Sequence, residues 1–303
     1  MLIQEPSRGL NAGLIHIGYP AALICISLLA ALMLRIAPAG GADSAYALWG
    51  WRVPFVIGAA LAAALFLYVY LLVPESETWQ SAQKSAAPLK DLFVRAQRRR
   101  LGRLFVVMSG AWLTLNATVG ALPGVIETVL GARSTGVNKG IMLGAALAAP
   151  LFPVMGMLSQ RVGRRAMIIV AGFVNLVPTC ALYLVLVAGG YRDPAALIFL
   201  VAPIIALSML VWPVITPYLT ESFNTEIRSS GYGVSYSLAA MLPGLYSFYM
   251  LGLAKLMPYE FTPVVLLALG ALLLSVGALA GPETKHVDLY DASLAPAASQ
   301  STA

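Results

Sequence analysis

The sequence predicts an all-α membrane protein, a bundle of about eight transmembrane helices. Of its 303 residues, 59% are hydrophobic and only 11% are charged, whereas charged residues make up about 25% of a typical soluble domain. The apolar residues gather in runs close to the roughly 17–25 residues that a helix needs to cross a bilayer. Short polar or basic stretches separate these runs, which is typical of a polytopic membrane protein.

Eight spans follow one another along the chain. They are expected over residues 10–34, 53–73, 102–129, 139–158, 166–188, 195–219, 231–256 and 262–281. The first apolar run exceeds the roughly 7–15 residues of a signal-peptide core, so we interpret it as a retained span. Prolines inside several spans predict kinks, which neighbouring helices can accommodate.

The loops between the spans predict their orientation. One side holds Arg8, the 74–101 segment, the Arg161–Arg165 loop, Arg228 and Lys285, and it carries roughly twice as many Lys and Arg residues as the other. Short cytoplasmic loops retain Lys and Arg, so both termini and the 74–101 segment are expected in the cytoplasm. That segment reads as a solvated linker that ends in a basic stop-transfer run. The alternative is a lipid-headgroup contact at Arg98–Arg103.

The composition excludes other classes of function. The net charge of +6 comes from loop residues between spans rather than from a basic patch, so no nucleic-acid partner is expected. Cys25 and Cys180 lie in apolar runs, and the two histidines, His16 and His286, form no ligand cluster, so neither a disulfide framework, a metal site nor a cofactor is predicted. The spans contain no nucleophile–base pair and no paired carboxylates, so an enzyme is not expected.

Residues 156–165 form a short basic turn between two spans. Gly156 and Gly163 allow the chain to reverse tightly, and Arg161, Arg164 and Arg165 place the turn in the cytoplasm. From the residues alone, this segment is a basic cytoplasmic hairpin.

An internal repeat divides the chain. Residues 73–76 (Val-Pro-Glu-Ser) close the second span, and residues 281–284 (Gly-Pro-Glu-Thr) close the eighth. Such internal similarity is typical of transporter halves. Six spans lie between the two marks, but only two precede the first. We therefore expect residues 1–73 to be a two-helix remnant of an N-terminal half, 74–101 a cytoplasmic linker, 102–281 a complete six-helix C-terminal half, and 282–303 a cytoplasmic polar tail.

The 156–165 segment resembles the Gly-x-x-x-Asp-Arg-x-Gly-Arg-Arg signature of the major facilitator superfamily, with Gln160 in place of Asp. Residues 49–55 (Trp-Gly-Trp-Arg-Val-Pro-Phe) are similar to the start of helix six in the metabolite:proton symporter branch of that family. Residues 221–231 resemble the branch's turn between helices ten and eleven, with Asn224 in place of Pro. Residues 6–9 resemble the approach to helix five, and residues 282–285 the exit from helix twelve.

The resemblance implies that the chain supplies helices five to twelve of a major facilitator-type bundle in the bacterial inner membrane. It implies a secondary active transporter of a small metabolite, an organic acid or a related polar compound, coupled to protons by alternating access. Its partners would be the metabolite, the proton and the lipid bilayer. The alternative is a non-transporting, truncated membrane remnant. Because alternating access moves one six-helix half against the other, the isolated chain is expected to show no uptake.

The resemblance also implies a gating role for residues on the cytoplasmic side. These are Gly156, Arg161, Gly163, Arg164 and Arg165 of the basic turn, with Glu221 and Arg228 at a second turn. The arginines can pair with carboxylates or with the carbonyls at helix C-termini, which would favour one state of the transporter. The alternative is that these charges only fix the topology.

Four residues within the spans are candidates for the substrate cavity, because polar groups in a membrane often mark function. Asn116 could line the cavity or hydrogen-bond between helices. Tyr236 and Tyr246 lie about 80° apart on an ideal helical wheel, so both could face the cavity or one could lie at a helix interface. His16 could relay protons, or it could be a satisfied packing residue.

Overall fold

The computed structural model of the chain describes residues 7–75, 80, 87–129, 131 and 134–287. These residues form helices, turns and loops without a strand, which confirms the predicted all-α membrane fold. The chain divides into two compact units, one of residues 1–20 with 83–303 and one of residues 21–82. We call them the bundle unit and the hairpin unit, and each is described by itself.

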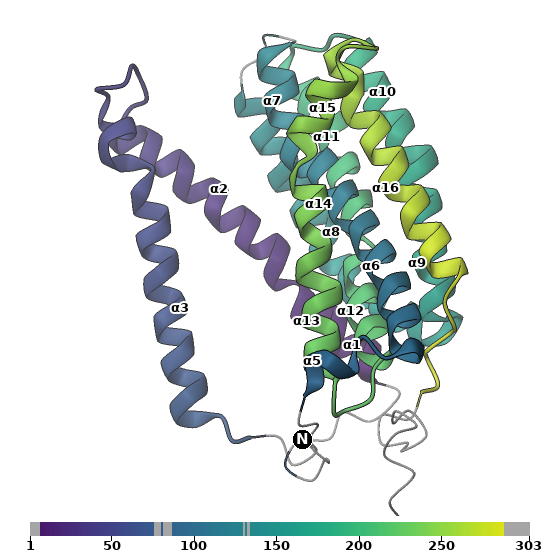
Figure 1. Cartoon of the computed structure of the whole chain (residues 1–303). Helices are drawn as coiled ribbons and strands as arrows, with labels where there is room; N and C mark the ends of the chain where they lie inside the picture. The colour runs from purple at the N-terminus through teal and green to yellow at the C-terminus, as the bar shows by residue number, and fades with distance from the viewer. Residues whose placement is uncertain (1–6, 76–79, 81–86, 130, 132–133, 288–303) are drawn as a thin grey trace, which may run out of the picture. The chain divides into compact units, whose positions relative to one another are not determined.

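The bundle unit contains the elements that build the candidate site (Figure 1). They are α1 (Arg8–His16), α5 (Pro88–Asp91), α6 (Arg95–Leu115), η3 (Asn116–Gly120), α7 (Ala121–Thr128), α8 (Ser134–Val162), α9 (Arg164–Val174), η4 (Asn175–Thr179), α10 (Cys180–Ala188), α11 (Pro194–Met209), α12 (Trp212–Glu221), α13 (Arg228–Ser237), η5 (Leu238–Ala240), α14 (Met241–Gly244), α15 (Tyr246–Leu253), η6 (Tyr259–Phe261) and α16 (Thr262–Leu279).

Small residues set the closest helix contacts in the bundle unit. α6 packs on α16 where Gly110 and Gly270 lie against each other's backbone. α8 packs on α11, and Gly140 and Gly144 of α8 leave no room for a side chain at that contact. Glycine lets membrane helices approach closely, so that van der Waals contact holds them together without a hydrophobic driving force.

The hairpin unit consists of most of α2 (Gly18–Ile36), η2 (Tyr46–Gly50) and α3 (Arg52–Leu72). α3 is apolar along its length and has no buried residue. Side chains such as Phe55 and Leu61 are about two-thirds exposed. A membrane helix with such a surface contacts lipid tails or further helices.

Within the described residues, seven helices are long and apolar enough to cross a membrane, and they correspond to seven of the eight predicted spans. The remaining predicted span, residues 231–256, is helical but interrupted, as the predicted kinks at prolines would allow. Short helical pieces, α13, η5, α14 and α15, follow one another there, and they run along the bundle in Figure 1. Pro243 has no N–H to donate and Gly244 is a weak helix former, so the regular hydrogen-bond ladder is interrupted.

Part of the predicted linker over 74–101 is helical in the structure. Residues 95–101 belong to α6, with Gln97 and Leu101 buried, because arginine is a good helix former and the apolar span continues from it. Residues 76–79 and 81–86 of that segment lie outside the described residues. Of the predicted polar tail, 282–287 are described, and 288–303 lie outside.

Candidate functional site

At one end of the bundle unit, the basic turn lies beside the end of α12 and the segment that follows α16. This end comprises residues 156–165, which run from the last turns of α8 into the start of α9, together with the end of α12 and residues 281–287 after α16. We call it the basic end. Gly163 separates α8 from α9 with φ 128°, a conformation that side chains other than glycine rarely adopt. A Cβ at Gly163 would also overlap the carboxylate of Glu283. The turn therefore needs glycine at this position for two reasons.

Arg164 is fully buried at the basic end and forms an ion pair with Glu221. The Arg164 Nη2 atom lies 3.2 Å from Glu221 Oε1, and Nε lies 3.3 Å from Oε2. Thr284 donates a further hydrogen bond to Glu221 Oε2 over 2.8 Å. The guanidinium and the carboxylate are therefore held by two parallel contacts, a geometry that makes such pairs specific as well as strong.

The remaining donors of Arg164 are satisfied by α8. They reach the carbonyl oxygen of Gly156, the hydroxyl of Ser159 and the side-chain oxygen of Gln160. A buried charge is tolerated only when it is paired and hydrogen-bonded, and both conditions are met here. Gln160 needs no charge to take part, because its amide oxygen accepts the hydrogen bond while Glu221 supplies the negative charge.

Glu283 connects the exit of α16 to the start of α9. Its carboxylate accepts hydrogen bonds from the backbone N–H groups of Arg164 and Arg165, over 2.7 and 3.1 Å. A carboxylate at a helix N-terminus satisfies free donors and complements the helix dipole. Lys285 adds a hydrogen bond from Nζ to the carbonyl oxygen of Arg161. The segment after α16 is thereby fastened across the basic turn.

α1 crosses α8 directly beside this network. A Cβ on Gly9 would overlap the carbonyl oxygen of Gly156, and one on Gly13 would overlap the backbone at Phe152. The same Cβ on Gly9 would lie 3.0 Å from Arg164 Nη1. Two glycines four positions apart are a known signal for close helix packing in membranes, and Gly9 and Gly13 have this spacing.

The structure distinguishes among the predicted gating residues. Gly156, Gly163, Arg164 and Glu221 meet in one network, as described above. The Arg161 and Arg165 residues lie at its periphery, where Arg165 donates to the carbonyl oxygen of Leu279 over 3.0 Å. Arg228 is the first residue of α13, and its Nε atom donates to the carbonyl oxygen of Phe223.

Aromatic side chains gather in the middle of the bundle unit. The ring of Tyr236 packs edge-to-face on Trp112 and Trp212, with centroids 5.4 and 6.2 Å apart, and it stacks on Tyr232. Tyr19 stacks on Trp212. We call these five residues the aromatic cluster. Trp112 donates to the carbonyl oxygen of Tyr236, whereas Trp212 Nε1 is buried without a hydrogen-bond partner in the described part of the chain.

Two other cavity candidates lie at the two ends of η3, which follows α6. Asn116 is half-buried at the first residue of η3, about one turn beyond Trp112. Tyr246 lies against Gly120, at the last residue of η3. The helix between Tyr236 and Tyr246 is interrupted, so the wheel angle predicted for an ideal helix does not apply. η3 has π-helical hydrogen bonding, and such bulges often occur at functional sites.

His16 lies at the end of α1 with both ring nitrogens within hydrogen-bond distance of a partner. Nδ1 is 2.9 Å from the carbonyl oxygen of Ala12, and Nε2 is 3.0 Å from Thr216 Oγ1. A carbonyl can only accept, so Nδ1 carries the proton and Nε2 of a neutral ring accepts from the hydroxyl. This geometry joins α1 to α12.

Comparison with known proteins identifies relatives of this chain. The family model of the Major Facilitator Superfamily matches residues 2–247. The chain is 28% identical over 223 residues to the alpha-ketoglutarate permease of Escherichia coli (strain K12), covering 73% of this chain and 50% of the permease. It is 29% identical over 259 residues to a putative metabolite transport protein of Haemophilus influenzae, covering 80% and 58%. It is 26% identical over 218 residues to the citrate-proton symporter of Klebsiella pneumoniae, covering 66% and 45%.

The chain thus spans about half the length of the curated relatives it matches. No solved structure matches it significantly.

Proposed function

Because the chain belongs to the major facilitator superfamily, we propose that it forms the C-terminal six-helix half and the last two N-terminal-half helices of a secondary transporter. The transported compound is a small metabolite, and the organic-acid substrates in the names of two relatives favour a carboxylate. The name of the citrate-proton symporter supports coupling to protons. In this arrangement the basic end faces the cytoplasm, as the distribution of Lys and Arg favours.

The observation that carries this proposal is the buried Arg164–Glu221 pair beside the α1–α8 crossing. Under the proposed organisation, α1 belongs to the N-terminal half, whereas α8, α9, α12 and α16 belong to the C-terminal half. Opening of the cytoplasmic side separates α1 from α8 at Gly9 and Gly156. Separation exposes Arg164 and Glu221 to water, so the pair has two distinct environments. A two-state element of this kind is what a gate requires.

The substrate would bind beside the aromatic cluster, where Asn116, Tyr236, Tyr246 and His16 supply polar groups. Trp212 Nε1 is a buried donor without a partner in the described residues, and leaving such a donor unsatisfied costs about 1–3 kcal/mol. A carboxylate or hydroxyl oxygen of the substrate would satisfy it. Aromatic rings around a few polar groups are typical of a small-molecule site.

Uptake into proteoliposomes tests this function. The vesicles would contain the chain together with the N-terminal segment of the alpha-ketoglutarate permease that precedes its matched region. We expect a pH gradient, alkaline inside, to drive uptake of 2-oxoglutarate or citrate, and a protonophore to abolish that uptake. Vesicles with either polypeptide alone are the controls, and we expect no uptake because alternating access needs both halves. Uptake by the chain alone, or no uptake by the inserted pair, would contradict the proposal.

A further inference from the structure

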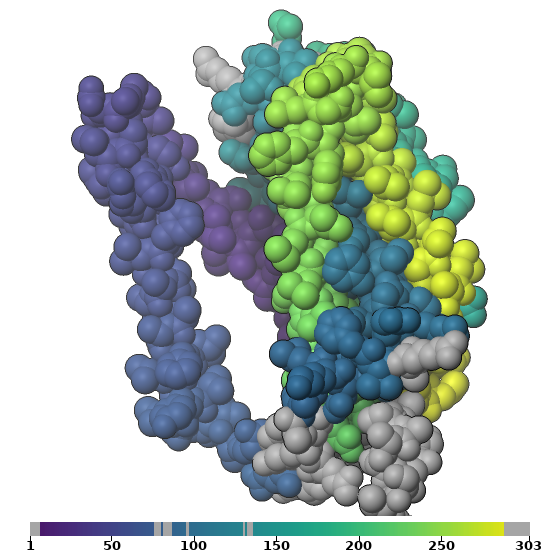
Figure 2. Space-filling view, in the orientation of Figure 1, coloured from purple at the N-terminus to yellow at the C-terminus, as the bar shows by residue number. Residues whose placement is uncertain are grey.

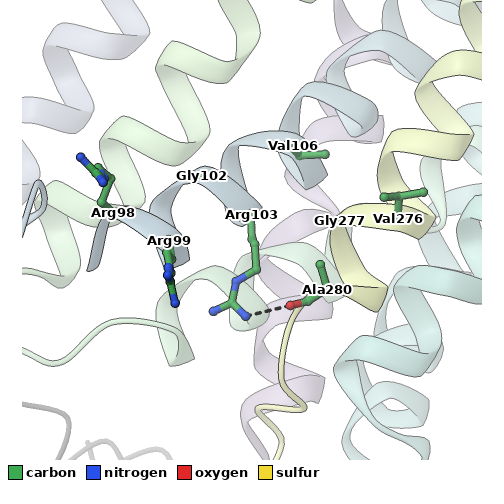
Figure 3. Close-up of a pocket in the computed structure, with 8 residues that line it drawn as sticks. All are labelled: Arg98, Arg99, Gly102, Arg103, Val106, Val276, Gly277 and Ala280. Carbon is green, nitrogen blue, oxygen red and sulfur yellow. Dashed lines mark hydrogen bonds between the residues drawn. The ribbon is translucent and has the colours of Figure 1, made fainter. Parts of the chain in front are cut away.

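A groove lies between α6 and α16 at the surface of the bundle unit, near the basic end. It has a volume of about 700 Å³ and combines arginines with small and apolar residues (Figure 3). Its lining residues are Arg98, Arg99, Gly102, Arg103 and Val106 of α6, Val276 and Gly277 of α16, and the following Ala280. The groove lies apart from the Arg164–Glu221 pair and the aromatic cluster, which supply none of its lining residues.

The groove concentrates positive charge. Arg99 and Arg103 are four residues apart on α6, and Figure 3 shows both side chains extending to the same side of the helix. Like charges at this spacing repel each other. Arg103 is fixed by a hydrogen bond to the carbonyl oxygen of Ala280 over 2.8 Å. None of the described residues that line the groove is acidic, so an anion between the two guanidinium groups would relieve the repulsion.

The α6 helix carries a further arginine next to these two, and one of its donor atoms has no partner among the described residues. The Nη1 atom of Arg100 is buried and has no hydrogen-bond partner among the described residues. A buried donor on a charged group is costly when it is unpaired. Arg100 does not line the groove, but its charge adds to that of Arg99 and Arg103, and such a concentration of guanidinium groups favours a ligand with several acceptor oxygens, such as a phosphate.

An apolar surface leads away from the charged part of the groove. Val276 is 58% exposed, and it belongs to a row of exposed apolar side chains on α16. The row consists of Val265, Leu269, Leu272, Val276 and Leu279. Their spacing of three or four residues puts them on one face of the helix. Figure 2 shows α16 (yellow) at the surface beside α6 (blue). A hydrocarbon chain can therefore lie along α16 while its charged end reaches the arginines.

We propose that this groove binds an anionic phospholipid, with its phosphate between Arg99 and Arg103 and an acyl chain along the exposed face of α16. Arg99 and Arg103 lie at the start of the apolar span of residues 97–128, which is the depth of the headgroups. Arginines at that depth attract anionic lipids. A zwitterionic lipid would lack the net charge, and a soluble anion would leave the apolar row unused.

Native mass spectrometry of the purified chain in detergent tests the proposal. The protein is titrated with phosphatidylglycerol and, separately, with phosphatidylcholine of the same acyl chains. We expect phosphatidylglycerol to bind at least tenfold more tightly. The double variant Arg99→Gln/Arg103→Gln should lose about tenfold or more of that affinity, because each arginine near an anionic headgroup contributes about fivefold. Arg192→Gln is the matched control, because Arg192 is exposed and is not among the residues that line the groove, and the affinity of this variant should stay within about twofold.

A second variant fills the groove without changing its charge. No atom lies within 4 Å of a Cβ added at Gly102, so Gly102→Phe can be accommodated and should weaken phosphatidylglycerol binding. Gly124→Phe, at an equally open position on α7, is its control. Equal binding of the two lipids would overturn the proposal, as would parent-like affinity in both groove variants. Displacement of the lipid by millimolar inorganic phosphate would assign the groove to a soluble anion and also overturn it.

Discussion

Arg164 and Glu221, 57 positions apart in the sequence, form a buried ion pair with 3.2 Å between Nη2 and Oε1. Both side chains are at least 98% buried. Several neighbouring segments hydrogen-bond to the pair. α8 supplies acceptors for the guanidinium, Thr284 supplies a donor for the carboxylate, and Glu283 binds the backbone of Arg164 itself. The pair is therefore the point at which α8, α9, α12 and the exit of α16 are joined.

Removing the arginine should destabilise the bundle strongly. Arg164→Ala leaves the Glu221 carboxylate buried without a partner, which costs about 3–5 kcal/mol. Arg161→Ala is the matched control at the exposed edge of the same turn, and it should change stability by no more than about 0.5 kcal/mol. Thermal unfolding in detergent measures both. Equal melting temperatures for the two variants would show that the pair contributes little to stability.

The α1–α8 crossing should not tolerate a side chain. Gly156→Ala places a methyl group against the backbone of Gly9, and such overpacking costs about 1–3 kcal/mol. Gly18→Ala is the control, because a Cβ at Gly18 has open space around it and alanine favours a helix by up to about 1 kcal/mol. The unfolding midpoints should therefore move in opposite directions. A Gly156→Ala protein as stable as the parent would mean that α1 and α8 do not pack this closely.

The carboxylate of Glu283 should protect the start of α9. Glu283→Ala removes the acceptor for the N–H groups of Arg164 and Arg165, and the loss of a helix cap costs about 0.5–2 kcal/mol. Hydrogen exchange should therefore become faster in the first turn of α9. Glu127→Ala, at an exposed position of α7, should leave that exchange rate unchanged. Unaltered protection in Glu283→Ala would rule out the capping role.

Substrate binding should change the fluorescence of the aromatic cluster. If 2-oxoglutarate or citrate binds beside Trp112 and Trp212, its addition should quench the tryptophan emission, and Trp212→Phe should weaken binding because the free Nε1 donor is lost. Trp49→Phe, at an exposed position in the hairpin unit, should leave the binding curve unchanged. Quenching that persists equally in Trp212→Phe would place the substrate elsewhere.

The pattern of apolar runs was sufficient to predict the helical fold, because a segment that crosses the membrane must satisfy its backbone N–H and C=O groups internally, as a helix does. Hydropathy could not show where the helix over 231–256 is interrupted, because that depends on Pro243 and on local geometry. It also placed Arg95–Arg100 in a linker, because charge is a signal for loops even where the helix extends beyond the membrane.

The site was predicted only in outline. The motif residues Gly156, Arg164 and Glu221 were identified, but spacing within a turn cannot show which of three arginines is buried. That depends on Gly163, whose positive φ directs the chain so that Arg164 points into the bundle. Glu283 and Thr284 could not be connected to the turn, because they are over a hundred positions away and meet it only through the fold. The spacing of Gly9 and Gly13 could have predicted a close helix contact for α1, although not that its partner is α8.

We propose above that the Arg164–Glu221 pair holds the basic end of the bundle unit closed. Ser222 is 8% exposed and follows Glu221, so a cysteine there reports on the opening of that end. In a Cys25→Ser background, Ser222→Cys is labelled with a membrane-impermeant maleimide in inside-out vesicles, and Cys180, buried in α10, serves as the internal control for unfolding.

We predict that Arg164→Ala accelerates labelling of the cysteine at position 222 at least tenfold, while Arg161→Ala has no effect and Cys180 stays protected. The acceleration should occur only in inside-out vesicles if, as we propose, the basic end faces the cytoplasm. An unchanged labelling rate in Arg164→Ala, or faster labelling from the opposite side, would contradict the account.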